Sequence, residues 1–251
     1  MPSGATAGRR LAALLLVAVT PNADGQPAGA RPVSAPAQWG QLTPGRYGVG
    51  FRLAGEYDHS RRVAPPTDFE GKPNAGPLSM PVQIGVWYPT ARTSARAMPF
   101  GIFAALGAKR NELTPVTEAD RARAIENRRA FAGFAFGMQL TDSAVRIADT
   151  TATAAVRDAA PSRGRFPVLL VATDGSIAAA TVLFEYLASH GIVVIATPSQ
   201  MSYATLQVSR PGVVIEARVR DLELLRSAMA RADADDARVP DRQSTLVRRG
   251  T

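Results

Sequence analysis

Two uninterrupted apolar segments in the second half of the chain give the clearest structural signal. Residues 168–172 read VLLVA and residues 192–196 read IVVIA. Runs of this length and composition are typical of strands that are buried on both faces of a sheet. The stretch between them has the length of one helix. We therefore predict two parallel, adjacent strands joined by a helical crossover.

Helical periodicity supports this arrangement. The connecting helix is predicted to end at His190-Gly191, because glycine readily adopts the left-handed conformation that stops a helix. The residues predicted to form its apolar stripe are Val182, Leu183, Tyr186 and Leu187. After the second strand, apolar residues recur at spacings of four, three, three and four, at Ile215, Val219, Leu222, Leu225 and Met229. Strand, helix, strand and helix over 166–230 predict an α/β fold with a parallel sheet.

Alternating apolar and polar positions predict two further strands in the first half of the chain. In residues 42–53 (LTPGRYGVGFRL), a Pro-Gly turn precedes apolar residues at every second position, which predicts an edge strand. Residues 54–80 are rich in proline, glycine and charge, and favour a long surface loop. Residues 81–89 (PVQIGVWYP) alternate again and predict a strand bounded by prolines.

The middle of the chain carries a weaker pattern. Thr117 and Asp120 have the spacing of a capping pair, which predicts a helix over 119–134. Phe131, Phe134 and Phe136 give this segment an apolar end, which either packs on the core or covers a pocket. Residues 142–165 are small, polar and alanine-rich, and indicate a linker or weakly formed elements.

The N-terminus has the features of an export signal. Arg9 and Arg10 precede an apolar run over 11–19 (LAALLLVAV), which is too short to span a bilayer, since spanning takes roughly 20 residues. We therefore expect an exported protein, periplasmic or secreted, with no integral membrane segment once the signal is removed. The expected organisation is a signal over 1–25, a flexible leader over 26–41, an incomplete α/β domain over 42–240 and an irregular tail over 241–251.

Composition excludes several classes of chemistry. The chain has no cysteine and two histidines, His59 and His190, so thiolate catalysis is excluded and neither a metal site nor a cofactor is expected. The formal net charge is +8, but the arginines are spread along the chain and interleaved with acids. A nucleic-acid partner is therefore not expected, because such a surface needs its cations gathered on one face or helix.

The loops after the two buried strands are the candidate site, because ligands of open α/β sheets bind beyond the carboxyl ends of the strands. The first loop contains Asp174, Gly175 and Ser176, and the second contains Ser199 and Gln200. A tight glycine turn into a helix exposes backbone N–H groups that can stabilise an oxyanion. The alternative is an ordinary strand-to-helix turn in which Ser176 caps the helix.

Five segments in order resemble landmarks of bacterial α/β-hydrolases of the dienelactone-hydrolase-like and platelet-activating-factor-acetylhydrolase-like groups. They are PGRYGVGFR (44–52), VQIGVWYP (82–89), FPVLLVATDG (166–175), LFEYLASHGIVVIATPS (183–199) and EARVRDLELL (216–225). The resemblance implies an α/β-hydrolase-type, mostly parallel sheet with antiparallel leading strands. It also implies export, and hydrolysis of small carboxylic esters or lactones by a serine, an acid and a histidine in full-length relatives.

The chain departs from this family in two respects. Many relatives carry His-Gly where this chain has Asp174-Gly175, and a carboxylate near a developing oxyanion opposes it unless the carboxylate points away or pairs with arginine. The nucleophile elbow, Gly-x-Ser-x-Gly, occurs nowhere in the 251 residues. His190 is expected to cap or pack, His59 has no partner motif, and Ser244 lacks flanking glycines. No catalytic residue is identifiable, and a truncation or frameshift near residue 240 is the expected cause.

Three hypotheses about function follow. The first is a chain of an ester- or lactone-hydrolase lineage that is itself inactive. The second is a non-catalytic exported binding protein that uses the α/β half-domain as a ligand or partner surface. The third is a basic module attracted to anionic envelope lipids or polymers.

Overall fold

The computed structural model describes residues 35–62, 70–73, 79–109, 113–173, 177–197 and 211–238, and in α6 the side chains over 211–215, 217 and 232–238 are not included. All of them belong to one compact unit, residues 33–251. In chain order the elements are η1 (Ala37–Trp39), β1 (Gly48–Arg62), β2 (Ser79–Thr90), α1 (Phe100–Gly107), α2 (Glu118–Phe136), α3 (Asp142–Thr150), β3 (Ala155–Arg157), β4 (Val168–Val171), η2 (Ile177–Ala180), α4 (Thr181–Ser189), β5 (Val193–Ala196) and α6 (Pro211–Arg238).

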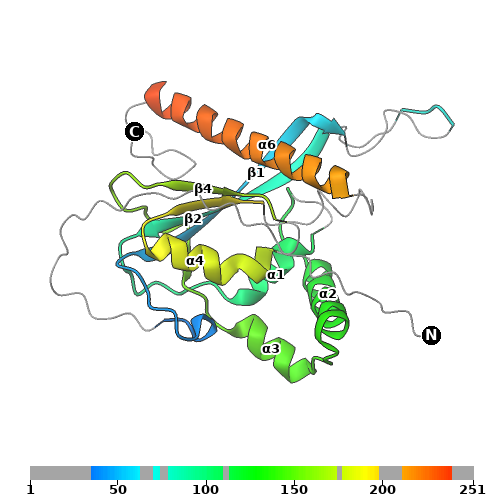
Figure 1. Ribbon diagram of the computed structural model, residues 1–251, viewed down its shortest axis with the longest axis vertical. Helices are drawn as coiled ribbons and strands as arrows, with labels where there is room; N and C mark the ends of the chain where they lie inside the picture. Colours follow the sequence, from blue (N-terminus) through cyan, green and yellow to red (C-terminus); the bar gives the residue numbers. More distant parts are fainter. Residues whose placement is uncertain are drawn as a thin grey trace, which may run out of the picture. The chain divides into compact units, whose positions relative to one another are not determined.

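The strands form one five-stranded sheet in the order β3-β1-β2-β5-β4 (Figure 1). β2 is antiparallel to both of its neighbours, β1 and β5, whereas β3 is parallel to β1 and β4 is parallel to β5. Four strands therefore point in one direction and only β2 points in the other. The predicted strand, helix, strand and helix over 166–230 are confirmed as β4, α4, β5 and α6, with the two strands parallel and adjacent.

The first two strands are longer than the alternation predicted. β1 continues from Gly48 to Arg62 and β2 begins at Ser79, so residues 54–62 and 79–80 of the expected loop belong to strands. The prediction that the first strand lies at an edge is wrong, because β3 pairs with its outer side over Val49, Gly50 and Phe51. This three-residue strand lies in the segment expected to be a linker, where single-sequence patterning carries no signal for so short an element.

Helices cover both faces of the sheet and enclose one apolar cluster on each. The larger cluster includes Phe51, Trp87, Phe103 and Phe184, and lies between the sheet and the helices α1 and α4. The smaller includes Ile84, Val86, Ile195 and Leu225, and lies under α6. In Figure 1, α6 accordingly lies on the opposite side of the sheet from α4 and α1. Alternation along β2 explains this division, since its even-numbered apolar residues face α6 and Trp87 faces α4.

The buried faces of two helices differ from the predicted stripes. In α4 the buried residues are Thr181, Phe184, Glu185, Ala188 and Ser189, whereas Leu183, which was assigned to the apolar stripe, is 37% exposed. In α6, Leu225 is buried as predicted, but Val219 is 48% exposed and Asp221 is fully buried. Each helix is rotated from its predicted orientation because a buried carboxylate, and not a further apolar residue, occupies the face toward the sheet.

The predicted capping pair is confirmed. The Thr117 side chain accepts a hydrogen bond from the Asp120 N–H at 3.2 Å, and the Asp120 carboxylate accepts one from the Thr117 N–H at 2.9 Å. These bonds satisfy two backbone donors that a helix start leaves open. α2 then runs to Phe136 and stops at Gly137, whose φ of 64° is left-handed.

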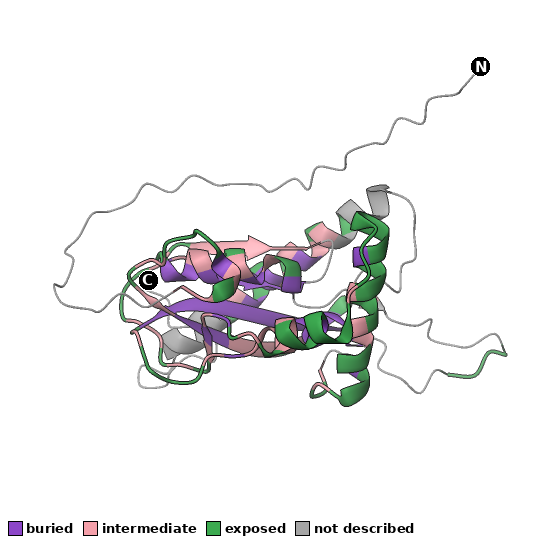
Figure 2. Cartoon of the chain, turned by 90° about the horizontal axis from the view of Figure 1, so that it is seen from below, coloured by how far each residue is buried: buried purple, intermediate pink, exposed green. Residues whose placement is uncertain are grey.

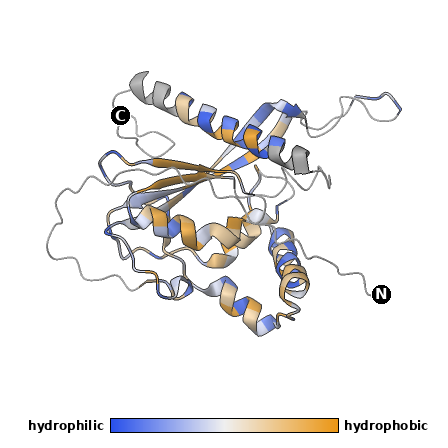
Figure 3. Ribbon diagram, viewed as in Figure 1, coloured by the Kyte–Doolittle hydropathy of each residue, from blue (hydrophilic) through white to orange (hydrophobic). Residues whose placement is uncertain are grey.

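The apolar end of α2 points to solvent. Phe131, Phe134 and Phe136 are 62%, 92% and 68% exposed, so the expectation that these rings pack on the core is wrong. Figure 2 shows the contrast between the exposed surface of α2 and the buried strands, and Figure 3 shows that β4 is hydrophobic along its length.

No helix within the described part of the chain is long and apolar enough to cross a membrane.

The architecture is a mixed α/β fold, as predicted. It has antiparallel leading strands, a mostly parallel sheet by strand direction and helices on both faces. It is consistent with the α/β-hydrolase type. β4 is the last strand in the sheet order, and no strand within the described ranges pairs with its outer side.

Candidate functional site

The carboxyl ends of β4 and β5 lie side by side. Val171, the last residue of β4, pairs in register with Ala196, the last residue of β5. The two loops that follow therefore leave the sheet at the same edge, where ligands of open α/β sheets bind. This register is the structural evidence that the two predicted site loops begin next to each other.

The predicted site residues themselves lie outside the described residues. Asp174, Gly175 and Ser176 follow Thr173, and Ser199 and Gln200 follow Thr197 by two and three positions, so their assignment as site residues stays a prediction. α4 begins at Thr181 with Ala180 as its N-cap residue. The alternative, in which Ser176 caps the helical segment, falls on a residue outside the described ones and stays a prediction as well.

Thr197 is the described residue that begins the second loop. It is 1% exposed, and its hydroxyl has no hydrogen-bond partner among the described residues. On the other side of the first loop, the Thr181 hydroxyl donates to the Ile177 carbonyl at 3.1 Å and closes η2 onto α4. Of the residues that flank the two loops, Ile177, Thr181 and Thr197 are buried, whereas Thr173 is partly exposed.

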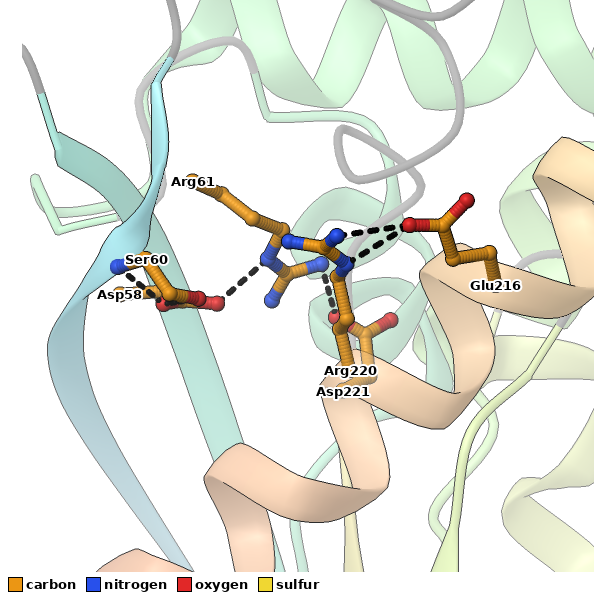
Figure 4. Close-up of polar contacts among 6 residues, drawn as sticks. All are labelled: Asp58, Ser60, Arg61, Glu216, Arg220 and Asp221. Carbon is orange, nitrogen blue, oxygen red and sulfur yellow. Dashed lines mark hydrogen bonds and ion pairs between the residues drawn. The ribbon is translucent and has the colours of Figure 1, made fainter.

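β1 and β2 extend past this edge as a hairpin and carry a cluster of charged side chains at its end (Figure 4). Nε of Arg61 donates to the Asp58 carboxylate, and a terminal nitrogen of Arg61 forms an ion pair with Asp221 of α6 at 2.7 Å. Ser60 donates to Asp58 from its N–H at 2.9 Å and from its hydroxyl at 2.6 Å. The cluster therefore joins the end of β1 to the buried face of α6.

The charges in this cluster are mutually stabilised. Burial by itself raises the pKa of Asp58, but the hydrogen bonds from Ser60 and Arg61 outweigh it, so the pKa lies below its ordinary value. Burial opposes the charge on Arg61, yet the carboxylates of Asp221 and Asp58 raise its pKa. Both carboxylates face a cation, so neither is set up as a general base. The cluster is structural.

A serine and a histidine lie together on the same hairpin. Nδ1 of His59 is 2.8 Å from Oγ of Ser79, across the irregular part of the β1–β2 pairing. No local motif pairs His59 with Ser79, because the two residues are 20 positions apart and the hairpin brings them together. The pair is exposed, and Ser79 is itself the partner of His59. The nearest carboxylate in sequence, Asp58, is held by Ser60 and Arg61.

His190 lies at the opposite edge of the sheet, as predicted. It is the C-cap residue of α4, and its Nδ1 lies 2.8 Å from the Tyr186 carbonyl and 3.1 Å from the Ser189 hydroxyl. Its ring packs on Tyr186 with centroids 4.2 Å apart. The expected capping and packing role is confirmed. Gly191, with φ of 92°, ends the helix as the sequence predicts.

The same opposite edge, where β1 and β3 begin, contains a cavity of about 370 Å³. Its walls come from η1 and the residues around it, the start of β1, the segment after β2, the segment before β3 and the end of α4. Arg92 is the one charged residue among its described lining residues. No local sequence pattern predicts this cavity, because five separate segments form it.

Glu185 is the buried carboxylate behind two of these walls. It is 0% exposed and accepts hydrogen bonds from Nε1 of Trp39 at 3.1 Å and from the N–H groups of Ala154 and Ala155 at 3.0 and 3.1 Å. Burial raises the pKa of Glu185, although these hydrogen bonds partly oppose the increase. Glu185 directly follows Phe184 and lies outside the predicted apolar stripe, so the local pattern did not predict its burial. Groups of acidic and histidine side chains able to hold a metal ion do not occur within the described ranges.

Among known proteins, similarity to this chain is found at the level of structure. Neither a protein-family model nor a curated protein sequence matches the chain. Among solved structures, the chain is similar to a ferulic acid esterase from Streptomyces cinnamoneus, with a TM-score of 0.44 and 19% sequence identity. The match covers 77% of this chain and 47% of that one, so this chain spans about half the length of that structure. At this level the likeness assigns neither a family nor an activity.

Proposed function

We propose that this chain belongs to a lineage of exported carboxylic-ester or lactone hydrolases and does not itself hydrolyse esters. The observation that carries the proposal is the register of β4 and β5, which starts both predicted site loops at the carboxyl edge of the sheet. The five sequence segments that resemble α/β-hydrolases support the same lineage. The proposed substrates of full-length relatives are small esters or lactones.

The proposed inactivity rests on the residues that covalent catalysis requires. A serine nucleophile needs a base within about 3 Å, a group that orients the base, and donors for the oxyanion. The sequence contains no Gly-x-Ser-x-Gly. Ser79 and His59 supply a hydroxyl and a base, but they lie on an exposed hairpin, and Asp58 is held by Arg61.

Export is proposed from Arg9, Arg10 and the apolar run over 11–19.

The test combines turnover with active-site labelling. We expect the purified chain to show no burst of p-nitrophenol with p-nitrophenyl alkanoates and no stoichiometric labelling by a fluorophosphonate. Peptide mapping after labelling identifies any modified serine. The matched variants are Ser79→Ala, which removes the hydroxyl paired with His59, and Ser60→Ala, which removes a neighbouring hydroxyl paired with a carboxylate.

Stoichiometric labelling at one serine, lost when that serine becomes alanine, would overturn the proposed inactivity. Labelling at Ser79 that also disappears in His59→Ala would locate the site on the hairpin. Labelling at Ser176 or Ser199 would locate the active site at the carboxyl edge.

Export is tested separately, by N-terminal sequencing of the protein from the extracytoplasmic fraction. We expect the mature protein to start near residue 26.

A further inference from the structure

The cavity at the amino edge of the sheet is separate from the predicted hydrolase site. Val49 and Val156 lie in its wall at the starts of β1 and β3, whereas the predicted loops follow the ends of β4 and β5. Its volume of about 370 Å³ falls within the range of small-molecule pockets, which is about 300–1,000 Å³. It is therefore large enough for a small organic ligand.

Hydrogen bonds hold the walls of this cavity in place without a ligand. Glu185 anchors Trp39 on one wall and Ala154 on another. Ser189 at the end of α4 anchors a third, because its hydroxyl accepts from the Gly45 N–H and its carbonyl from the Tyr47 N–H, both at 3.0 Å. A side chain at position 45 would collide with this carbonyl, since a Cβ there would lie 2.1 Å from it. The cavity is preformed, which lowers the entropic cost of binding.

The polar groups of the cavity select the charge of its ligand. Most of its lining residues are alanine, proline, valine, glycine and aromatic residues. Arg92 is their one charged group, and its guanidinium donates to the Gly45 carbonyl at 2.9 Å, which orients it at the wall. A guanidinium presents several N–H donors in a planar fork that matches a carboxylate. An apolar cavity with one oriented cation fits a ligand with an apolar body and one anionic group.

We propose that this cavity binds a small monocarboxylate with an aromatic or aliphatic body, with the carboxylate at Arg92 and the apolar body against Trp39. This binding is independent of ester hydrolysis, because it uses none of the loops at the carboxyl edge. It makes the chain a carboxylate-binding protein whether or not the opposite edge supports catalysis.

The experiment compares an acid with its uncharged analogue on the full chain. 3-Phenylpropanoate and 3-phenylpropan-1-ol are titrated by isothermal calorimetry and by tryptophan fluorescence. We expect the acid to bind about tenfold or more tightly than the alcohol, as a charge-assisted hydrogen bond predicts. We expect the fluorescence change to disappear in Trp39→Phe, because Trp39 lines the cavity whereas the other tryptophan, Trp87, lies in the larger core cluster and not in the cavity lining.

Three variants locate the site. Arg92→Gln is expected to remove the preference for the acid and to leave the affinity for the alcohol within about twofold. Arg96→Gln is the matched control, because Arg96 is exposed and lies outside the cavity lining. Ala97→Phe introduces a ring at the lining and is expected to abolish binding of both compounds.

The proposal is overturned if neither compound binds, or if the acid and the alcohol bind equally. It is also overturned if Arg92→Gln and Arg96→Gln have the same effect on binding of the acid. Circular dichroism shows whether each variant is folded. If Ala97→Phe does not fold, the comparison of Arg92→Gln with Arg96→Gln decides the outcome alone.

Discussion

At the scale of single residues, two buried carboxylates determine how the helices pack. Glu185 of α4 and Asp221 of α6 are both 0% exposed. A buried carboxylate is costly unless it is hydrogen-bonded or paired. Glu185 meets this requirement with three N–H donors, and Asp221 meets it with Arg61. They therefore link segments that are far apart in the chain.

Replacement of Glu185 by glutamine tests its anchoring role. Glutamine has one acceptor oxygen, and its NH₂ group faces donors, so we expect Glu185→Gln to lower the free energy of unfolding by about 1–3 kcal/mol. Glu223→Gln on the exposed face of α6 is the matched control, with an expected change of less than about 0.5 kcal/mol. Urea denaturation measures both, and equal effects would contradict the anchoring role.

The pH dependence of stability provides a second test of Glu185. Burial raises its pKa, so the folded state holds the proton more tightly than the unfolded state does. Its stabilising contribution is complete below the ordinary carboxyl pKa and decreases as the pH rises through the raised value. The stability of the native chain relative to Glu185→Gln should therefore decrease over this range. A difference that is constant with pH, or that increases, would contradict the assignment.

At the scale of elements, the contact between β1 and α6 depends on the charged cluster at the end of the hairpin. Arg61 joins Asp58 of its own strand to Asp221 of the helix, and Arg231 forms an ion pair with Glu56 further along the same strand. The Arg61 pair is buried, whereas Arg231 is 55% exposed. Exposed ion pairs contribute little to stability, so the buried pair is expected to dominate the polar part of this contact.

Replacement of Arg61 by methionine leaves Asp221 buried without its cation. We expect Arg61→Met to lower the free energy of unfolding by about 3–5 kcal/mol. Arg220→Met is the matched control, because Arg220 lies beside Asp221 in sequence but pairs with Glu216 on the exposed side of α6. Its expected cost is about 0.3–0.5 kcal/mol. Denaturant unfolding measures both variants.

A double variant distinguishes a lost charge pair from lost packing. Arg61→Met combined with Asp221→Asn removes both charges, so we expect it to be more stable than Arg61→Met alone. If the double variant is as unstable as the sum of the two single variants, the cost arises from packing of the arginine side chain, and the electrostatic account is wrong.

At the scale of the whole molecule, the apolar residues divide between an enclosed core and an exposed helix end. Phe184 is 1% exposed between α4 and the sheet, whereas Phe134 at the end of α2 is 92% exposed. Three exposed phenylalanines on one helix end are unusual for a monomer surface and favour association. The hydrophobic effect therefore contributes to folding at one position and to self-association at the other.

The same substitution at both phenylalanines separates these effects. We expect Phe184→Ala to cost about 3–5 kcal/mol of unfolding free energy, because it leaves a cavity in the core. Phe134→Ala is expected to change it by less than about 0.5 kcal/mol and to lower light scattering at high protein concentration. A large loss of stability in Phe134→Ala would show that this ring is covered in solution.

The sequence by itself determined the class of the fold and the elements with strong periodicity. Two apolar runs, a capping pair and a terminal glycine predicted β4, β5, the start of α2 and the end of α4, because these signals are local. Tertiary structure alone decided which faces of α4 and α6 are buried, since Glu185 and Asp221 find partners 30 or more residues away. It also decided that β3 pairs with β1, that Ser79 contacts His59, and that five segments line a cavity that includes Arg92. Such features depend on contacts between distant segments, and no single stretch of the chain encodes them.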